Sequence, residues 1–189
     1  MKKILVACEC SQVVTSAFRA AGADAWSCDL EPSYGLLPQY HIQGDVRLVL
    51  DGSISWDLVI AHPPCTYLCR MSAQWLNRRI ERWDKMFEAR EFFMFFTSLK
   101  IPTCIENPIP LRAAQLPPPS QLINPCNFGH PYSKRTYLWL YGLPPLLPMK
   151  GYYLNAPSWL LHCSGNSKRR SRFWEGIAEA MAAQWLPLV

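Results

Sequence analysis

Long hydrophobic runs and a secretion signal are both missing from this sequence of 189 residues. No apolar run approaches the roughly 20 residues that a membrane-spanning helix requires, so we expect no membrane segment. The N-terminal apolar stretch ends at the acidic residue Glu9, and it is too short for a signal peptide. These absences favour a protein of the cytoplasm.

Charged residues and glycines are also scarce. Only 17% of the residues are charged, whereas 50% are hydrophobic, and this composition excludes a disordered chain. The glycines are scattered, and none forms the G-x-G turn that dinucleotide-binding folds place after their first strand. The length favours one globular domain.

The charges that are present are divided unevenly along the chain. Residues 1–60 contain four Lys or Arg and seven Asp or Glu, whereas residues 61–189 contain 15 basic and seven acidic residues. An acidic part beside a basic part fits a hydroxyl-rich ligand on one side and a polyanion on the other. Ordinary solvated surface would give the same division, so the charge alone leaves both interpretations open.

Eight cysteines are many for a chain of this length. In a cytoplasmic protein they are not expected to form disulfides. The pairs Cys8/Cys10 and Cys65/Cys69 lack the C-x₂-C spacing of a zinc site, so we expect no metal site. Cysteines within strands are interpreted as small buried side chains.

Short apolar runs alternate with segments of helical periodicity along the chain. Strands alternating with helices predict an α/β fold, with a mostly parallel twisted sheet covered by helices on both faces. The proline-rich stretches 107–132 and 143–165 are expected to be irregular. The expected strands are 3–8, 24–28, 42–46, 57–61, 101–105 and 136–141, and the expected helices are 12–21, 75–99 and 173–185.

Two acidic residues follow successive strands, where ligands bind in sheets of this kind. Asp29 ends the second strand, about twenty residues after the first strand–helix turn, where an acid commonly accepts hydrogen bonds from ribose hydroxyls. Asp45 follows the third strand. Either acid could instead cap a turn or helix. Two acids without a glycine-rich turn favour an adenosine-type ligand that lacks phosphates, such as S-adenosylmethionine.

Candidate catalytic groups follow two further strands. In His62-Pro63-Pro64-Cys65 two prolines make a stiff loop, and the thiol after them is a candidate nucleophile of low pKa. Glu106 follows the next strand and would stand beside Cys65 if the two strands are neighbours. A thiol that attacks and a carboxyl group that shares a proton form a coherent pair. The alternatives without a catalytic role are that Cys65 is an incidental cysteine in a proline-rich turn and that Glu106 is a structural acid.

Taken in order, these segments resemble motifs of the DNA cytosine-5 methyltransferases, and more closely those of compact phage- and prophage-type members without a large target-recognition domain. The resemblance covers nearly the whole chain. The matching segments are Leu5-Val6-Ala7-Cys8-Glu9-Cys10-Ser11, Asp29-Leu30-Glu31, Gly44-Asp45-Val46, Pro63-Pro64-Cys65, Glu106-Asn107-Pro108, Ser133-Lys134-Arg135 and Gly165-Asn166-Ser167.

The resemblance implies a fold, a cofactor and roles for residues. The fold is the Rossmann-like one of class I S-adenosylmethionine-dependent methyltransferases, as one domain over residues 1–189, with 1–60 binding cofactor and 61–189 carrying the catalytic and substrate residues. Cys65 would add to C6 of cytosine, Glu106 would protonate or hydrogen-bond N3, and Arg135 would hold the pyrimidine carbonyl. The implied cofactor-binding residues are Ala7, Glu9, Ser11, Asp29, Leu30, Asp45, Val46, Pro63 and Asn166.

DNA is the partner that the resemblance implies, in the host cytoplasm if the chain is phage-encoded. Only residues 143–164 stand where a target-recognition domain would be inserted, so a separate specificity partner is one possibility. Basic residues could hold phosphates, or they could be solvated helix ends. These candidate nucleic-acid-binding residues are Arg70, Arg78, Arg79, Lys134, Lys168, Arg169, Arg170 and Arg172.

Three other functions fit the same residues. A free cytosine nucleotide such as dCMP could replace DNA as substrate. His62-Pro63-Pro64-Cys65 also resembles the Asp/Asn-Pro-Pro-aromatic tetrad of amino-methyltransferases, which methylate an exocyclic nitrogen without a thiol nucleophile. The glycine-poor first motif is compatible with a non-catalytic nucleic-acid-binding module on the same scaffold.

Overall fold

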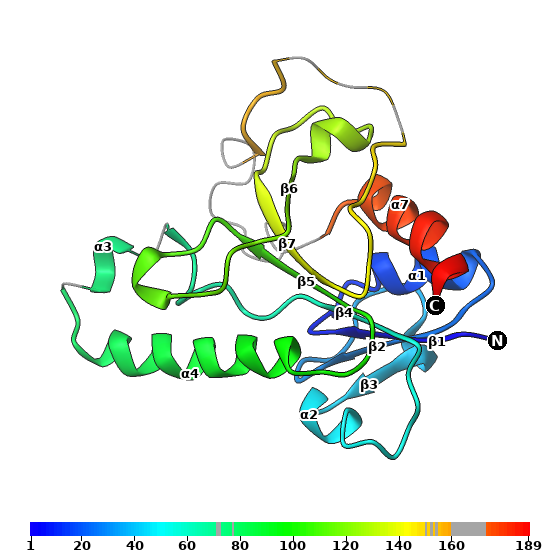
Figure 1. Cartoon of the computed structure of the whole chain (residues 1–189), viewed down its shortest axis with the longest axis horizontal. Coiled ribbons are helices and arrows are strands. Elements are labelled where there is room, and N and C mark those ends of the chain that lie inside the picture. Colours follow the sequence, from blue (N-terminus) through cyan, green and yellow to red (C-terminus); the bar gives the residue numbers. More distant parts are fainter. Residues whose placement is uncertain (71–72, 77, 150, 152, 154, 160–172) are drawn as a thin grey trace.

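Seven strands form one sheet in the computed structural model, which describes residues 1–70, 73–76, 78–149, 151, 153, 155–159 and 173–189 (Figure 1). The order is β3-β2-β1-β4-β5-β7-β6, and β7 alone runs antiparallel to its two neighbours. The strands are β1 (Lys3–Ala7), β2 (Asp24–Asp29), β3 (His41–Gln43), β4 (Leu58–Ala61), β5 (Thr103–Pro108), β6 (Gln121–Ile123) and β7 (Thr136–Tyr141).

The order of the first five strand positions is that of a doubly wound Rossmann-like sheet. The chain moves outward from β1 to β3 on one side and then from β4 to β5 on the other. The strand order therefore reverses between β1 and β4. Ligands bind outside the carboxyl ends of the strands at such a reversal.

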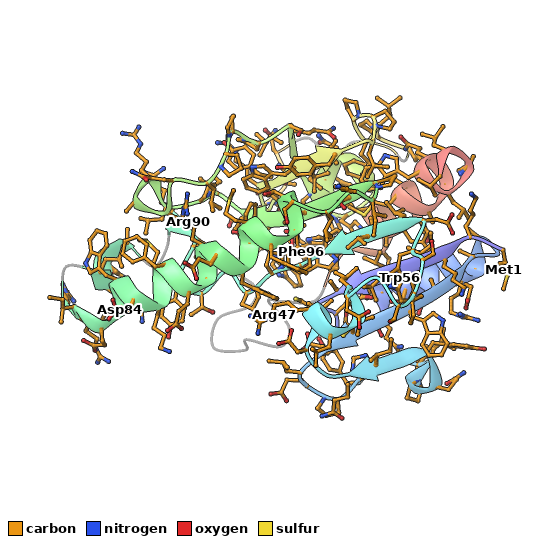
Figure 2. The ribbon with its side chains drawn as sticks, turned by 60° about the horizontal axis from the view of Figure 1, so that its bottom comes forward. Met1, Arg47, Trp56, Asp84, Arg90 and Phe96 are labelled. Atoms are coloured by element: carbon orange, nitrogen blue, oxygen red, sulfur yellow. The ribbon has the colours of Figure 1, made fainter. Side chains whose placement is uncertain are left out.

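Helices cover both faces of the sheet, as the strand–helix alternation predicts. On one face α1 (Val13–Ala20) and α7 (Glu175–Trp185) bury side chains such as Phe18 and Met181 against β1, β4 and β7. On the other face α2 (Val46–Val49) and α4 (Glu81–Thr97) bury Val46, Phe93 and Phe96. Helix α4 extends beyond the sheet to Asp84 and meets α3 (Ala73–Leu76) there (Figures 1 and 2). None of the helices in the described ranges is both long enough and apolar enough to span a membrane.

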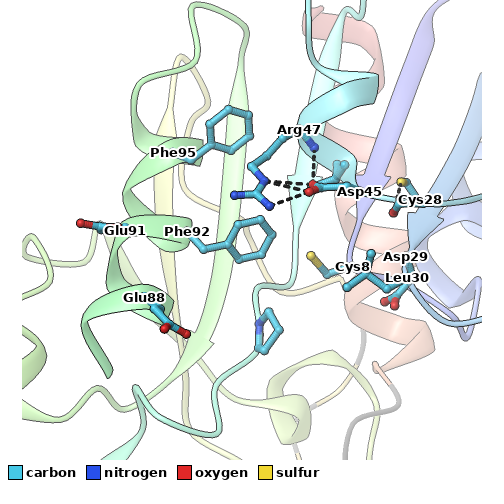
Figure 3. A pocket seen from close by; sticks show the side chains of 13 residues that line it. Cys8, Cys28, Asp29, Leu30, Asp45, Arg47, Glu88, Glu91, Phe92 and Phe95 are labelled. Carbon is cyan, nitrogen blue, oxygen red and sulfur yellow. Dashed lines mark hydrogen bonds and ion pairs between the residues drawn. The ribbon is translucent and has the colours of Figure 1, made fainter. Parts of the chain in front are cut away.

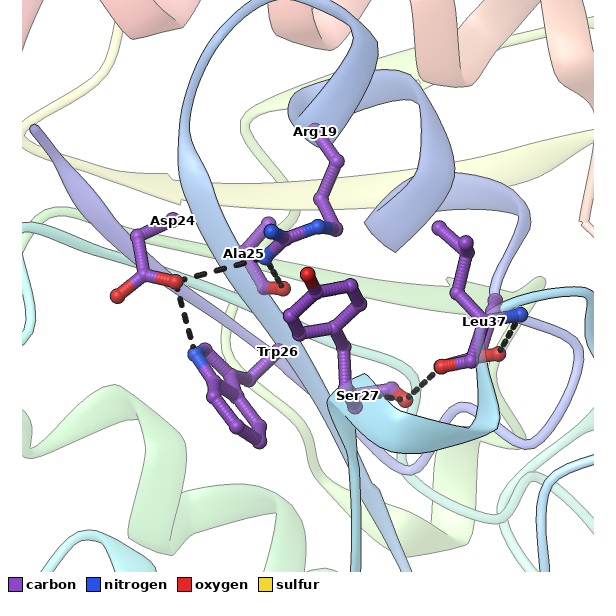
Figure 4. A network of polar contacts seen from close by, with 8 residues as sticks. Arg19, Asp24, Ala25, Trp26, Ser27 and Leu37 are labelled. Atoms are coloured by element: carbon purple, nitrogen blue, oxygen red, sulfur yellow. Dashed lines mark hydrogen bonds and ion pairs between the residues drawn. The ribbon is translucent and has the colours of Figure 1, made fainter.

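Aromatic and ionic contacts join α1 to β2 (Figure 4). The Arg19 guanidinium lies 3.2 Å from the ring centre of Tyr40 and donates to the Ala25 carbonyl at 3.0 Å. Asp24 accepts hydrogen bonds from Arg19 at 3.4 Å and from the Trp26 indole at 3.0 Å. These contacts hold the first βαβ unit, whose strands end at the cavity described below.

Three expected elements were wrong in their extent. The strand expected over 101–105 is observed as β5, Thr103–Pro108. The strand expected over 42–46 ends at Gln43, because the Asp45 carboxylate accepts the Arg47 N–H at 2.9 Å and starts α2 at Val46. The helix expected over 75–99 is divided into α3 and α4. At the start of α4 the Arg82 and Trp83 N–H groups bond the carbonyls of Arg79 and Ile80, only three residues earlier, in tight turns that a continuous α-helix lacks.

The stretch 107–132 is more regular than its prolines suggest. Strand β5 continues through Pro108, because each of its last residues pairs with β7, and β6 pairs with the other edge of β7. These pairings join segments far apart in sequence. Short 3₁₀ turns at Arg112–Ala114 and Pro125–Phe128 occupy much of the remainder.

Glu9 is buried and serves as the N-terminal cap of α1. Gln12, the residue that precedes α1, is in the left-handed conformation at φ 56° and its side chain caps nothing. The Glu9 carboxylate instead accepts from the Val14 N–H at 2.8 Å, from the Thr15 N–H at 3.1 Å and from the Thr15 hydroxyl at 2.7 Å. A carboxylate at a helix N-terminus also meets the positive end of the helix dipole.

Replacing Glu9 by alanine is expected to lower the free energy of unfolding by about 2–4 kcal/mol, because two buried N–H groups lose their charged acceptor. Urea denaturation of the two proteins measures this difference. The exposed Glu31→Ala variant is the control and should change the free energy of unfolding by less than about 0.5 kcal/mol. An unchanged Glu9→Ala midpoint would contradict the capping role.

Candidate functional site

A cavity of about 680 Å³ opens at the carboxyl ends of β1 and β2, beside the reversal of strand order (Figure 3). Its volume lies within the range of small-molecule sites. One wall comes from the strand ends and the other from α4. The lining residues are Cys8, Cys28, Asp29, Leu30, Gly44, Asp45, Val46, Arg47, Pro64, Glu88, Glu91, Phe92 and Phe95.

The turn after β1 has a backbone conformation that usually requires glycine, but the residue in that conformation is Cys8. Cys8 adopts φ 59°, in the left-handed region that favours glycine. Its N–H donates to the Cys28 carbonyl at 2.7 Å, so the turn is tied to the end of β2. Burial raises the pKa of the Cys8 thiol, and the charge of Asp29 raises it further, so this lining group is neutral. A small uncharged side chain therefore occupies the place of the missing glycine.

Two carboxylates stand on the strand side of the cavity. Asp29 accepts the Glu31 N–H at 3.0 Å, which fixes it in the turn after β2. Asp45 accepts the Arg47 Nε at 3.0 Å on each of its oxygens (Figure 3). The side-chain hydrogen bonds from Arg47, followed by its backbone N–H, lower the pKa of Asp45, which is therefore ionised at neutral pH.

Acidic side chains outnumber basic ones around the cavity. Asp29 and Asp45 line its strand side, and Glu88 and Glu91 line its α4 side, with the Glu91 carboxylate pointing away from the strand ends in Figure 3. Among the lining residues that the structure describes, Arg47, 5.8 Å from the ring centre of Phe92, is the one cation. This surplus of negative charge opposes a polyphosphate and suits a ligand that carries hydroxyl groups and positive charge. Phe92 and Phe95 add apolar surface for a flat ring.

The loop after β4 connects the cavity to a second cluster of polar residues. The His62 N–H donates to the Ala7 carbonyl at 2.9 Å, and the buried amide of Asn107 donates to the Pro63 carbonyl at 3.4 Å. These bonds hold the loop between β1 and β5. Pro64 lines the cavity, and Cys65 is the next residue.

Glu106 and His62 form a pair at the end of β5. The two side chains are 13% and 12% exposed, and His62 Nδ1 lies 3.2 Å from Glu106 Oε2. Burial raises the pKa of Glu106, but the hydrogen bond and charge of His62, aided by Lys134 and Thr136, outweigh it and leave the pKa lowered. The carboxylate is therefore ionised at neutral pH.

Cys65 is a neutral thiol, which corrects the expectation of a nucleophile with a low pKa. A hydrogen bond with Cys69 is the largest cause that raises the pKa of Cys65, followed by burial and by the negative charge of Glu106. Lys134 lowers this pKa, but by less. Attack by Cys65 therefore needs a base that removes its proton during the reaction.

Replacing Cys69 by alanine removes the largest cause of the raised pKa, so Cys65 should be alkylated several-fold faster at pH 8, where the thiolate is the reactive form. Iodoacetamide labelling followed by peptide mass spectrometry measures the rate at Cys65 in both proteins. Cys126, which lies in a 3₁₀ turn of another segment, serves as the internal reference. Equal rates at Cys65 would contradict this account of its protonation.

The expected cofactor-binding residues are only partly brought together. Four line the cavity, whereas Ala7 and Pro63 are buried beside it and Ser11 donates to Glu9 at 3.4 Å. The Glu9 carboxylate accepts hydrogen bonds from the first N–H groups of α1. Asn166 lies outside the described residues. The four that line the cavity are Asp29, Leu30, Asp45 and Val46.

The basic residues are placed differently from the expectation. Lys134 is half-buried, and its charge acts on both Cys65 and Glu106, whereas Arg135 is exposed at the start of β7. Lys134 therefore supplies positive charge to this pair. Arg70, Arg78 and Arg79 are exposed, with the Arg78 guanidinium 5.6 Å from the Trp75 ring. The remaining candidates lie outside the described residues: Lys168, Arg169, Arg170 and Arg172.

Sequence reasoning missed the α4 wall of the cavity. Glu88, Glu91, Phe92 and Phe95 recur at three- and four-residue spacing, which places them on one face of the helix. That spacing was visible in the sequence, but nothing local indicates that this face meets the ends of β1 and β2. Arg47 was missed as well, because its place in the cavity wall depends on its hydrogen bonds to the Asp45 carboxylate.

Comparisons with known proteins show similarity to solved structures and not to characterised sequences. No family model matches the sequence, and no curated protein matches it. One similar solved structure is a prophage-encoded E. coli protein assigned by its name as a DNA modification methyltransferase, at 14% identity and a TM-score of 0.47. The match covers 74% of this chain and 46% of that one, so the chain spans less than half of its length.

Proposed function

We propose that this protein is an S-adenosylmethionine-dependent methyltransferase that modifies cytosine at C5 in DNA, with Cys65 as the nucleophile. One observation carries the proposal. A cavity suited to an adenosine-bearing cation ends at Pro64, and the next residue is a thiol within electrostatic reach of the carboxylate of Glu106. Cofactor and substrate chemistry would therefore meet at one loop.

The cavity residues fit the proposed cofactor. Asp29, at the end of β2, would accept hydrogen bonds from the ribose hydroxyls. Val46 and Phe92 offer apolar surface to the adenine ring, and the surplus of acids suits a sulfonium and an ammonium group. When bound, the cofactor supplies an electrophilic methyl group.

In the resting protein the proposed catalytic pair is a neutral Cys65 thiol and an ionised Glu106 carboxylate. These protonation states allow a proton to move from Cys65 through Glu106 to the base. The Cys65 thiol forms a bond from sulfur to C6, and its proton passes to the Glu106 carboxylate and from there to N3 of the base. The C5–C6 double bond opens, and C5 becomes the nucleophile that takes the methyl group. The raised pKa of Cys65 and the lowered pKa of Glu106 place the proton on sulfur at the start of this path.

Lys134 completes the proposed substrate site. Its positive charge acts on both members of the catalytic pair, so it would stabilise the negative charge that develops on the pyrimidine carbonyl. Exposed guanidinium groups of Arg70, Arg78 and Arg79 would contact phosphates. In duplex DNA the target base must leave the stack to reach Cys65.

Methylation of an exocyclic amino group is a second candidate, favoured by a separate observation. His62 begins the Pro-Pro loop, and its buried Nε2 has no hydrogen-bond partner among residues 1–70, 73–76, 78–149, 151, 153, 155–159 and 173–189. An imidazole nitrogen in that state can accept a hydrogen bond from an amino group. In this chemistry Cys65→Ser would be tolerated and His62→Ala would not.

The proposal is tested in three separate reactions, each containing the protein and methyl-labelled S-adenosylmethionine. The substrate is duplex DNA in the first, single-stranded DNA in the second and dCMP in the third. Digestion and mass spectrometry identify the labelled nucleoside. Label in 5-methylcytosine from DNA supports the proposal, and label in dCMP alone moves the substrate to the free nucleotide. Label in N4-methylcytosine supports the second candidate. No label with any substrate contradicts both.

Replacing Asp29 by alanine should weaken binding of S-adenosylhomocysteine, the demethylated cofactor, by about 10–100-fold, because two ribose hydroxyls lose a charged acceptor. Isothermal titration calorimetry gives the dissociation constants. The matched control is Asp51→Ala, since Asp51 is an exposed acid that does not line the cavity. Equal affinities for the Asp29 variant and the unmodified protein would contradict the placement of the ribose.

A further inference from the structure

The proposed reaction leaves one proton without an acceptor. Methylation at C5 replaces a hydrogen by a methyl group, so each turnover must remove one proton from that carbon. The proton that leaves the Cys65 sulfur travels through Glu106 to N3, and it returns when the sulfur is expelled. The C5 proton therefore needs a separate base.

His62 has the geometry of such a base. The Glu106 carboxylate is ionised and can only accept, so the bond of 3.2 Å places a proton on Nδ1 of His62. When the ring carries a single proton, held on Nδ1 by this bond, Nε2 has the free lone pair that a base needs. That nitrogen is buried, and none of the residues that the structure describes forms a hydrogen bond with it. A buried unpaired acceptor costs stability, so its retention points to a partner that arrives with the substrate.

The ring of His62 is held in place from several sides. Its backbone is tied to Ala7 at 2.9 Å, and its ring packs on Phe173 with centroids 4.7 Å apart. Pro63 and Pro64, whose φ angles are fixed, separate it from Cys65. The imidazole and the thiol therefore belong to one stiff loop, and Glu106 interacts with both.

The other ionisable groups of this cluster are unsuited to the task. Lys134 is a cation and has no lone pair to offer. Glu106 already carries the proton between Cys65 and N3, and the Cys69 thiol is engaged with Cys65. Among the described groups that act on this pair, His62 is the remaining base.

We propose that His62, oriented by Glu106, accepts the proton that leaves C5. The electrons of the C5–H bond form the C5–C6 double bond, the C6–S bond breaks, and its electron pair returns to the Cys65 sulfur. The proton moves to Nε2 of His62 and from there to solvent. This inference rests on the proposed C5 chemistry.

Hydrogen exchange at C5 tests this role without methyl transfer. When Cys65 adds to C6, C5 can gain a deuteron from D₂O and lose its proton before the sulfur leaves, so deuterium enters cytosine. The experiment incubates cytosine-containing DNA with each protein and S-adenosylhomocysteine in D₂O, and mass spectrometry measures the label. We expect exchange with the unmodified protein, none with Cys65→Ala, and a rate about 100-fold lower with His62→Asn.

Two further measurements separate a chemical role of His62 from a structural one. His62 does not line the cofactor cavity, so His62→Asn should bind S-adenosylhomocysteine with its affinity changed less than about twofold. Added imidazole should restore exchange at least about tenfold in His62→Ala, whose shortened side chain leaves room for it.

The outcomes distinguish this inference from the proposed function. Exchange by His62→Asn at the unmodified rate would overturn the role of His62 and leave Cys65 as the nucleophile. A slow His62→Asn variant with weakened cofactor affinity, together with a His62→Ala variant that imidazole does not rescue, would overturn it too, because the loss would then come from a folding defect. No exchange by the unmodified protein would overturn the Cys65 chemistry itself.

Discussion

Replacing Cys65 by alanine is expected to abolish methyl transfer to cytosine and to leave cofactor binding unchanged. In the proposed mechanism the thiol adds to C6, and without that bond C5 does not become nucleophilic enough to take a methyl group. We expect a loss of at least about 1,000-fold in the rate of methyl transfer under single-turnover conditions. Cys65 does not line the cofactor cavity, so the dissociation constant of S-adenosylhomocysteine should stay within about twofold.

The matched control for this prediction is Cys126→Ala. Cys126 is a buried free thiol, whereas Cys65 is half-buried, and Cys126 lies in a 3₁₀ turn outside the proposed catalytic cluster. It should transfer methyl groups at the unmodified rate. Turnover by Cys65→Ala within tenfold of that rate would exclude covalent catalysis by this thiol and favour methylation of the amino group.

Replacing Glu106 by glutamine is expected to lower the rate of methyl transfer by at least about 100-fold. Glutamine keeps the shape of the side chain but cannot take the proton from the raised-pKa thiol of Cys65 and pass it to N3. It also loses the charged acceptor for His62 Nδ1. Single-turnover rates and calorimetry of cofactor binding separate this chemical loss from a structural one.

For Glu106→Gln we also predict a change in how the stability of the folded protein depends on pH in the acid range. The folded-state pKa of Glu106 is lowered, so this group stabilises the folded protein above the pKa of an unfolded glutamate, near 4.3, and that contribution is lost as the pH falls through the folded pKa. Glu106→Gln should therefore lose less stability than the unmodified protein between pH 5 and pH 3. Parallel pH curves in thermal melts would contradict the lowered pKa.

The sheet and the acids of the cavity could be predicted because their signals are local. Short apolar runs gave β1, β2 and β4, and a strand end followed by an acid gave the positions of Asp29 and Asp45. Parallel strands end at a common edge, so residues after different strands meet there whatever the rest of the chain does.

What could not be predicted depends on contacts between distant segments. Glu9 was expected to touch a cofactor, but it caps α1, because the preceding turn gives that helix no other acceptor. The positive charge of Lys134 acts on Cys65, which belongs to a segment far away in the sequence. The raised pKa of Cys65 depends on Cys69, whose bond to it no motif indicates.

The most direct test of the central claim uses DNA in which fluorine replaces hydrogen at C5 of cytosine. After methyl transfer no proton can leave C5, so the C6–S bond cannot break and the base remains attached to the nucleophile. With S-adenosylmethionine present, mass spectrometry of the digested protein should find a methylated fluorocytosine on Cys65, and none in Cys65→Ala. Methylated product without any attachment to Cys65 would contradict the covalent mechanism.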